Sequence, residues 1–221
     1  DEVDEIARQA SLAGLRLIPV PVRHLGTERC RSVLKAMKDH LSSHVEFQLE
    51  VPALRIIVDD GGVSGIETAA GVRLDCRYLI LAPGREGADW LSRQAKQLRV
   101  TTHNNPVDIG VRVEVPVPIM ERLTNVLYEA KLEYFSQSFD DRIRTFCMCP
   151  AGEVTLETTG GDDPVVTVNG HSYANRKSNN TNFALLVSTD FTEPFHEPIA
   201  YGKYLVRLAN ILSGGVLVQR L

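Results

Sequence analysis

The sequence predicts an α+β protein organised as two lobes, and three observations support this prediction. Apolar residues recur at helical spacing in five segments. Between these segments lie short runs that are continuously apolar, or that alternate with polar residues, as is typical of strands. A polar, turn-forming segment over residues 101–106 separates the first part of the chain from a second part richer in strand-like sequence. We therefore expect lobes over residues 1–99 and 100–221.

The first lobe is expected to contain helices and a β-meander. A helix over residues 3–15 stops near Gly14, because glycine commonly follows the end of a helix. Residues 17–22 are extended, since each proline biases the residue before it away from the helical region. Thr27 is a natural N-cap for an amphipathic helix. The expected elements from there on are this helix over 27–41, a half-buried strand over 45–51, a meander over 54–82 and a helix over 89–98.

The second lobe is predicted to consist mainly of strands. Residues 107–115 alternate, with valines on one face and with Arg112 and Glu114 on the other. Turns rich in Asp and Gly separate the short strands that follow. The expected strands cover 131–135, 143–148, 153–156, 165–169 and 183–187, and the expected helices cover 119–127 and 200–212, the last ending at Gly214.

Composition and charge exclude several classes of protein. The 221 residues carry a formal net charge of −4, which gives no electrostatic reason to expect nucleic acid or an anionic membrane as a partner. No window approaches the ~18 consecutive apolar residues of a membrane span. The acidic first residues do not resemble a secretory signal, and four cysteines do not make a disulfide framework in a chain this long. We expect a cytoplasmic protein, and an excised segment, because the chain enters helical sequence without an initiator Met.

A buried strand that stops at a glycine is the feature most suggestive of function. The apolar run over residues 74–82 leads into Ala82, Pro83 and Gly84. Glycine allows the backbone to approach a ligand closely, and open α/β sheets bind ligands at the carboxyl ends of strands. An ordinary strand-ending turn is the alternative. The G-x-G-x-x-G turn that would complete a dinucleotide site is absent from these residues.

Val51 lies between the predicted strand over 45–51 and the meander. In dinucleotide-binding folds this position can offer backbone hydrogen bonds to an adenine edge. The residue type favours a buried core valine, whereas the position favours a contact with the ligand.

Residues 146–152, Phe-Cys-Met-Cys-Pro-Ala-Gly, form the most unusual heptapeptide of the chain. We expect Cys147 and Cys149 to point to opposite faces of a strand, so that they do not bind one metal together unless the strand breaks at Pro150. A zinc site would need two more ligands, and only His171 is available, so no metal is predicted. The thioredoxin-type redox motif has two residues between its cysteines, not one. Small buried thiols beside a turn are the favoured interpretation.

A dense polar run over residues 169–182 precedes the apolar strand. Its side chains can donate and accept hydrogen bonds, and Arg176 can bind a phosphate or a carboxylate. Exposed loops use the same residue types, so an ordinary loop is the alternative. No Ser/His/Asp arrangement, carboxylate pair or phosphate loop is recognised, and the histidines outside this run are assigned no role.

Several of these segments occur together in a recognisable order. They are residues 23–27 ahead of a helix, 81–85 at the end of the meander, 108–114, 146–150 and 184–187. With them the chain resembles, from about residue 22 onward, the uncharacterised bacterial FAD-dependent dehydrogenases. These are related to the BaiN/RdsA-type and glutathione-reductase-like flavoproteins. The Cys-Met-Cys-Pro segment together with Gly-Val-Arg-Val-Glu is the most specific part of the resemblance.

The resemblance implies an FAD-binding lobe over 1–99, present only in part, and an inserted mixed α/β domain over 100–221. The glycine-rich turn and a C-terminal flavin-contacting segment would lie outside this chain. The positions that would lie near the FAD adenosine are Val51, Ala82, Pro83 and Gly84. The inserted domain would cover the isoalloxazine ring and shape a substrate pocket, whose candidate residues are Cys147, Cys149, His171, Arg176 and Asn180. Ala151 stands where the family pattern would have a second glycine, and Pro83 stands where it would have a small residue.

These observations predict the central part of an FAD-dependent oxidoreductase of unknown substrate. We expect this part alone to bind FAD weakly or not at all, and to be inactive. The alternative is a non-catalytic module that binds a ligand, a metal or a partner through the cysteines and the polar run. A stand-alone hydrolase is a distant third, because no nucleophile and base are paired.

Overall fold

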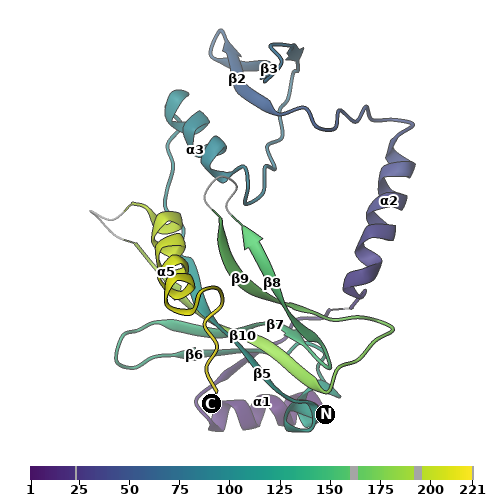
Figure 1. Ribbon diagram of the computed structural model, residues 1–221, viewed down its shortest axis with the longest axis vertical. Coiled ribbons are helices and arrows are strands. Elements are labelled where there is room, and N and C mark those ends of the chain that lie inside the picture. Colours follow the sequence, from purple (N-terminus) through teal and green to yellow (C-terminus); the bar gives the residue numbers. More distant parts are fainter. Residues whose placement is uncertain (23, 160–163, 192–195, 221) are drawn as a thin grey trace. The chain divides into compact units, whose positions relative to one another are not determined.

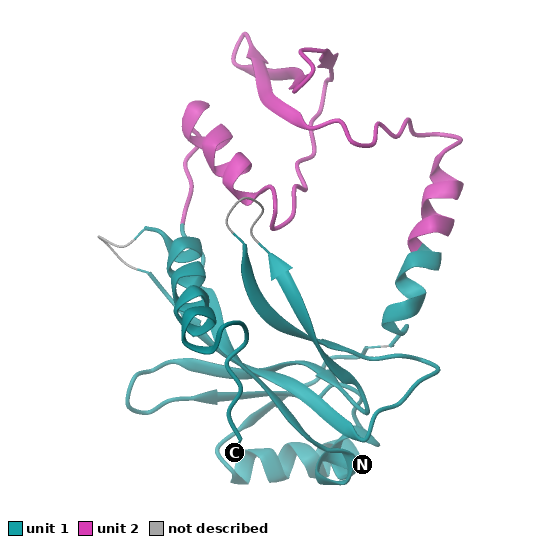
Figure 2. Cartoon of the chain, in the orientation of Figure 1, with its two compact units in different colours: residues 1–33, 104–221 teal, residues 34–103 magenta. Residues whose placement is uncertain are grey.

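The computed structural model describes residues 1–22, 24–159, 164–191 and 196–220 (Figure 1). The predicted α+β class is confirmed, since the chain combines helices with antiparallel sheets. The chain forms two compact units (Figure 2). Unit 1 combines residues 1–33 with 104–221, and unit 2 covers residues 34–103. Arg23, in one of the family-like segments, and the predicted Asp/Gly turn at 160–163 lie outside the described residues.

Unit 1 is built on an antiparallel sheet in the order β1-β6-β7-β10-β5, with β8 and β9 forming a separate hairpin. The predicted strands of this part of the chain are confirmed, with ends shifted by a few residues. The strands of unit 1 are β1 (Arg16–Ile18), β5 (Val107–Pro116), β6 (Lys131–Phe135), β7 (Arg142–Cys149), β8 (Glu153–Thr159), β9 (Val165–His171) and β10 (Asn180–Thr189). Its helices are α1 (Glu2–Leu12), α4 (Val117–Thr124) and α5 (Pro198–Ser213), and α5 ends at the left-handed Gly214 as expected.

Strand β10 is an inner strand of this sheet. It pairs with β5 over ten consecutive residues and with β7 on its other side. The β5 contact is so close at Gly110 that a Cβ there would lie 1.8 Å from the Leu185 carbonyl oxygen. The sheet therefore fixes the positions of side chains that are far apart in sequence but face one another across β5, β10 and β7.

The N-terminal segment belongs to this sheet. β1 pairs with β6, and Arg16 forms an ion pair with the buried carboxylate of Glu133. Further along, the Thr27 amide donates to the Ser172 carbonyl at 2.8 Å, and Glu28 accepts a hydrogen bond from the Ala174 amide at 2.9 Å. Residues 1–33 thus pack with residues 104–221. The assignment of a flavin-binding lobe to 1–99 and an inserted domain to 100–221 stays a prediction.

Unit 2 contains a small meander, a helix and most of a second helix. The strands are β2 (Ala53–Asp59), β3 (Gly62–Thr68) and β4 (Arg73–Asp75), all antiparallel. The helix is α3 (Ala88–Gln97), and α2 (Cys30–Leu41) enters the unit at Leu34. Buried Gln94 of α3 accepts a hydrogen bond from the Ile56 amide at 2.8 Å. Trp90 donates from Nε1 to the Leu54 carbonyl at 2.9 Å. These two contacts attach α3 to β2.

Three sequence predictions were wrong here. Residues 45–51 form no strand, because alternation marks a face that can be buried but supplies no partner strand. The run over 74–82 is a strand only in β4 and does not form a parallel strand, and the Ile80 side chain is 91% exposed. Thr27 does not cap a helix directly, since a 3₁₀ turn (Thr27–Arg29) precedes α2 (Cys30–Leu41).

Within the described residues, buried apolar side chains are confined to unit 1. They are Ala10, Ala130, Met148, Cys149, Val165 and Ala184. In the part of unit 2 that the structure describes, the buried side chains are polar, and large apolar ones are open to solvent, with Leu34 64% exposed. The exposed area of 16202 Å² exceeds the roughly 12,000 Å² expected of two separate globular units of these sizes. Unit 2 therefore presents large apolar side chains to solvent.

Among the helices that the structure describes, none combines the length and the apolar content needed to cross a bilayer.

Candidate functional site

Strand β7 carries a β-bulge at the two cysteines of the unusual heptapeptide. Ala184 of β10 pairs with Phe146 and Asn182 pairs with Cys149, so three steps along β7 oppose two along β10. Cys147 adopts φ +46°, a left-handed conformation that costs a non-glycine residue about 1–2 kcal/mol. The expectation that Cys147 and Cys149 point to opposite faces was wrong. Residues two apart in a regular strand share a face, and at the bulge the Cys149 Sγ lies 3.5 Å from the Cys147 carbonyl oxygen.

An arginine and an asparagine from two other strands meet this bulge. Arg112 of β5 donates from Nη1 to the Asn182 side-chain oxygen at 2.7 Å and to the Cys147 carbonyl at 3.2 Å. Asn182 of β10 is fully buried. Gly170 of β9 leaves the room that they need, since a Cβ there would lie 2.3 Å from Arg112 Nη1 and 2.8 Å from Cys149 Sγ.

Two hydroxyl groups lie on the other side of Cys149. The Tyr128 hydroxyl and the buried Ser172 Oγ lie close together near this thiol, but neither makes a hydrogen bond of good geometry. The His24 ring stacks on Tyr128, with ring centroids 4.6 Å apart, and its Nε2 lies 3.2 Å from the Ser172 carbonyl. We call the six residues Arg112, Tyr128, Cys147, Cys149, Ser172 and Asn182 the Cys147 cluster.

The Cys147 cluster holds buried hydrogen-bond donors with no partner among the described residues. These are Nε of Arg112, the Tyr128 hydroxyl, Oγ of Ser172 and Nδ2 of Asn182. An unpaired buried donor costs about 1–3 kcal/mol, so such groups are rare in the interior of a protein and require an explanation. Arg112 and Asn182 meet at the Cys147 bulge, and Tyr128 and Ser172 lie near Cys149, so these donors are available to an acceptor-rich group. The cluster thus has the chemistry of a binding site for an anion or a carbonyl oxygen.

The electrostatics of the cluster separate the two thiols. The hydrogen bond from the Cys149 thiol lowers the pKa of Cys147 to about 6, and the positive charge of Arg112 acts in the same direction. The same hydrogen bond, together with burial, raises the pKa of Cys149. Burial also raises the pKa of the Tyr128 hydroxyl. The two pKa values thus shift in opposite directions, and Cys147 is the thiol of the pair that ionises first.

The polar run over 169–182 wraps the turn that follows the cysteines. The Ser178 amide donates to the Ala151 carbonyl at 2.9 Å, and its hydroxyl lies 2.5 Å from the Gly152 carbonyl oxygen. The Ala151 amide donates to Oγ1 of Thr181, which is fully buried. The two segments that the sequence analysis singled out separately are thus one structural unit.

Ala151 has φ +47°, and we expect its replacement by glycine to stabilise the protein. Glycine adopts this conformation without strain, which outweighs its greater freedom in the unfolded chain by about 0.5–1 kcal/mol. Urea denaturation measures the change. Ala174→Gly is the control, because Ala174 lies in the polar run over 169–182 and does not have a positive φ. This substitution should be neutral or destabilising. Equal effects of the two substitutions would contradict the expected relief of strain.

Three other candidate residues lie beside the cluster without contacting the thiols. Arg176 forms an ion pair with Glu153 at 2.5 Å and lies over the Tyr173 ring, so its charge is already partnered. His171 ends β9 and contacts Tyr173 edge-on. Asn180 begins β10, and its backbone is bonded to the Ser178 hydroxyl. Their place in a substrate pocket stays a prediction.

The candidates for flavin contact all lie in unit 2. Val51 is not the buried core residue that its type favoured, since it is 43% exposed in an irregular segment. Ala82 is exposed, Pro83 is half-buried, and Gly84 adopts φ +66° with no atom within 4 Å of the point where a Cβ would lie. The backbone at Gly84 is therefore open to the approach of a ligand.

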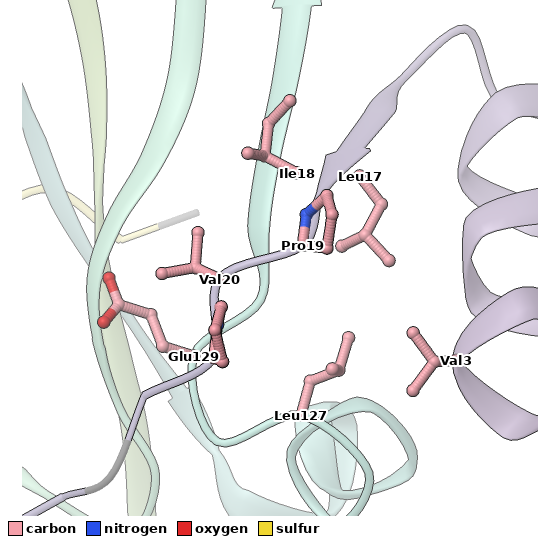
Figure 3. A pocket seen from close by; sticks show the side chains of 8 residues that line it. Val3, Leu17, Ile18, Pro19, Val20, Leu127 and Glu129 are labelled. Atoms are coloured by element: carbon pink, nitrogen blue, oxygen red, sulfur yellow. The ribbon is translucent and has the colours of Figure 1, made fainter.

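An apolar cavity of about 390 Å³ adjoins the Cys147 cluster in unit 1. In Figure 3, Val3 of α1 faces Leu17 and Leu127, and the Glu129 carboxylate lies on the side of Val20. Glu129 also accepts a hydrogen bond from the Cys147 amide at 3.1 Å. One side chain thus connects the wall of the cavity with the bulge.

Sequence reasoning missed most of the cluster. Arg112 was placed on the polar face of its strand, Asn182 was one of several residues in a polar run, and Tyr128 and Ser172 were not singled out. A charged residue in the middle of a valine-rich strand was the available signal. Among the described residues, no group of three or more His, Cys, Asp or Glu side chains could hold a metal ion.

Comparison with known proteins places this site in the context of flavoproteins. Residues 106–208 match the family described as FAD-dependent protein, C-terminal domain-like. The matched span runs from β5 into α5 and contains every residue of the Cys147 cluster. It supports a relationship to an FAD-dependent family.

A particular relative is an uncharacterized protein of Clostridium beijerinckii. It is 28% identical over 181 residues, which cover 75% of this chain and 32% of the relative. The chain thus spans about a third of the length of the relative that it matches.

Proposed function

We propose that this chain is an interior part of an FAD-dependent oxidoreductase whose substrate is unknown. The observation that carries the proposal is the match of residues 106–208 to a family of FAD-dependent proteins. The much greater length of the relative supports the idea of an interior part. So does the apolar surface of unit 2, which includes Leu34, Met37, Leu49, Leu54, Tyr78 and Ile80.

The described residues of unit 2 fit one portion of FAD. The open backbone at Gly84 and the exposed Val51 suit the edge of an adenosine. The pyrophosphate does not fit the N-termini of α1 and α3, because it requires a helix N-terminus with free amides and no competing negative charge. The first turn of α1 is acidic and capped by Asp1, and the first turn of α3 contains Asp89. We therefore expect the phosphates to be held by residues outside this chain.

The inserted domain supplies the substrate side in this proposal. Cys147 and Cys149 would face the substrate together with Arg112, which the structure adds to the predicted set. His171, Arg176 and Asn180 would complete the pocket from the polar run. The unpaired donors of the Cys147 cluster support this role, because a carboxylate or carbonyl group of a substrate would satisfy them.

Flavin retention tests the proposal. The purified 221-residue chain, mixed with FAD and passed through a gel-filtration column, is expected to emerge without flavin absorbance. The full-length protein that contains this chain is expected to emerge yellow, with one FAD per polypeptide. A colourless full-length protein would overturn the proposal, and a yellow 221-residue chain would overturn the expectation about the isolated part.

The variants Gly84→Val and Gly71→Val test whether FAD contacts the backbone at Gly84. Both glycines have positive φ, +66° and +77°, and both have open space where a Cβ would lie, so the strain introduced is matched. Only Gly84 is a predicted FAD contact. Gly84→Val is expected to weaken FAD binding by the full-length protein about tenfold or more, which corresponds to about 1.4 kcal/mol. Gly71→Val should leave binding unchanged, and equal losses would contradict the assignment.

The second candidate is a non-catalytic binding module. The four unpaired donors favour it as well, since they require an acceptor but not a reaction. Metal analysis of the purified protein tests whether the non-catalytic module binds a metal. Stoichiometric zinc or iron would support this form of the candidate, and a metal-free protein would not. Reduction of bound flavin by a nicotinamide cofactor in the full-length protein would exclude the non-catalytic candidate.

A further inference from the structure

The two cysteines of the β7 bulge have features of a reactive pair. Cys147 is half-buried and Cys149 is 4% exposed, so one thiol is accessible and the other is sheltered. The Cys149 Sγ lies 3.5 Å from the Cys147 carbonyl oxygen, and each thiol shifts the pKa of the other. Cα atoms two residues apart are separated by at most about 7 Å, which lies at the upper limit of the Cα separations that disulfides bridge.

The surroundings of the pair differ from those of a structural thiol. The positive φ of Cys147 is the kind of backbone strain that persists where surrounding structure enforces it, often at functional sites. The guanidinium of Arg112 lies against Cys147, and a positive charge favours a thiolate. The unpaired donors of Arg112, Ser172 and Tyr128 can stabilise a second anion beside it.

We propose that Cys147 and Cys149 form a redox-active dithiol that reduces small disulfide substrates. Cys147 is the attacking thiolate and Cys149 is the resolving thiol. The pKa values agree with these roles, because the pKa of Cys147 is lowered to about 6 and that of Cys149 is raised. The proposal goes beyond the flavin-dependent function and does not require it.

The reaction balances in two steps. The Cys147 thiolate attacks one sulfur of the substrate disulfide, a mixed disulfide forms, and the first substrate thiolate leaves. Cys149 then gives its proton to that thiolate and attacks the Cys147 sulfur, which releases the second substrate thiolate to be protonated by water. The protein dithiol loses two electrons, the substrate disulfide gains them, and a dithiol reductant restores the protein.

Trapping with glutathione disulfide tests the proposal. The background is the chain with Cys30→Ser and Cys76→Ser, which removes the other two free cysteines. Mass spectrometry is expected to show a Cys147–Cys149 disulfide in this background. With Cys149→Ser added, Cys147 should hold one glutathione, because the serine hydroxyl can still donate to Cys147 but cannot resolve the mixed disulfide. With Cys147→Ser added instead, Cys149 should remain a thiol.

The outcomes that overturn the proposal are equally distinct. They are two unmodified cysteines after treatment with glutathione disulfide, or modification of Cys149 at the rate of Cys147. The pH profile gives an independent readout in the Cys149→Ser chain, where the midpoint for alkylation of Cys147 should lie below the ordinary value of 9.0 because Arg112 still favours the thiolate. Adding Arg112→Met should move this midpoint upward, and Arg112→Lys should restore part of the shift. None of these measurements needs flavin, so failure of the flavin proposal leaves them unaffected.

Discussion

Replacing Gly170 by alanine is expected to destabilise unit 1 by about 2–6 kcal/mol and to abolish the lowered pKa of Cys147. The new Cβ would lie 2.3 Å from Arg112 Nη1, 2.5 Å from the Asn182 side-chain oxygen and 2.8 Å from Cys149 Sγ. The hydrogen bond from Arg112 to Asn182 would have to break. Overpacking and an unpaired buried donor each cost about 1–3 kcal/mol, which gives the expected range.

The pH dependence of stability is a second readout of the same substitution. The pKa of Cys147 is about 6 in the folded protein and 9.0 ordinarily. A depressed pKa stabilises the folded state fully above the ordinary value, and this contribution is lost as the pH falls toward 6. In the native sequence the free energy of unfolding should therefore gain a rising contribution between pH 6 and 9, and Gly170→Ala should remove it. The raised pKa of Cys149 acts in the opposite sense only above pH 9.

Urea denaturation at several pH values measures both effects. Gly202→Ala in α5 is the matched control, because a Cβ there meets its neighbours at an ordinary 3.5 Å. This control should be neutral or slightly stabilising, as alanine favours a helix. A Gly170→Ala protein with native stability and a native Cys147 titration would show that the cluster is not packed as described.

Amides of unit 2 are expected to exchange with solvent at least about a hundredfold faster than those of β10 in the isolated chain. Among the described residues of unit 2 no apolar side chain is buried, so little free energy opposes the opening of its hydrogen bonds. Strand β10 is paired on both sides and serves as the internal reference. Hydrogen exchange followed by mass spectrometry resolves the two regions.

The full-length protein supplies the comparison for this prediction. There the apolar face of unit 2, including Met37 and Leu54, is expected to be covered and its amides to be protected. Protection of unit 2 equal to that of β10 in the isolated chain would contradict the idea that this unit lacks a core of its own.

Sequence patterns predicted the strands of unit 1 well because each is specified locally. Strand β6 was predicted with its observed limits, and the alternation of β5 gave its length to within one residue. The failures share a physical cause. Two patterns, the alternation over residues 45–51 and the apolar run over 74–82, indicate side chains that are suited to burial. Burial also requires packing partners, and the described part of unit 2 does not provide them.

The site was less predictable than the fold, because it depends on the register between strands. The cysteines and the polar run were singled out from the sequence, yet Arg112 reaches Asn182 only through the pairing of β5 with β10. The two residues are 70 positions apart, and nothing local to either indicates the other. The bulge at Cys147, too, is visible only in the shifted register of β7.

The pairing of β1 with β6 has a practical meaning for anyone who divides this polypeptide for expression. A piece that starts at residue 100, where composition suggests a cut, would discard β1 and strip the outermost row of backbone hydrogen bonds from the sheet. The unpaired edge of β6 would then be available to strands of other molecules, which is a common route to aggregation. Supplying residues 1–33 as a separate peptide should cap that edge and keep the shortened protein monomeric.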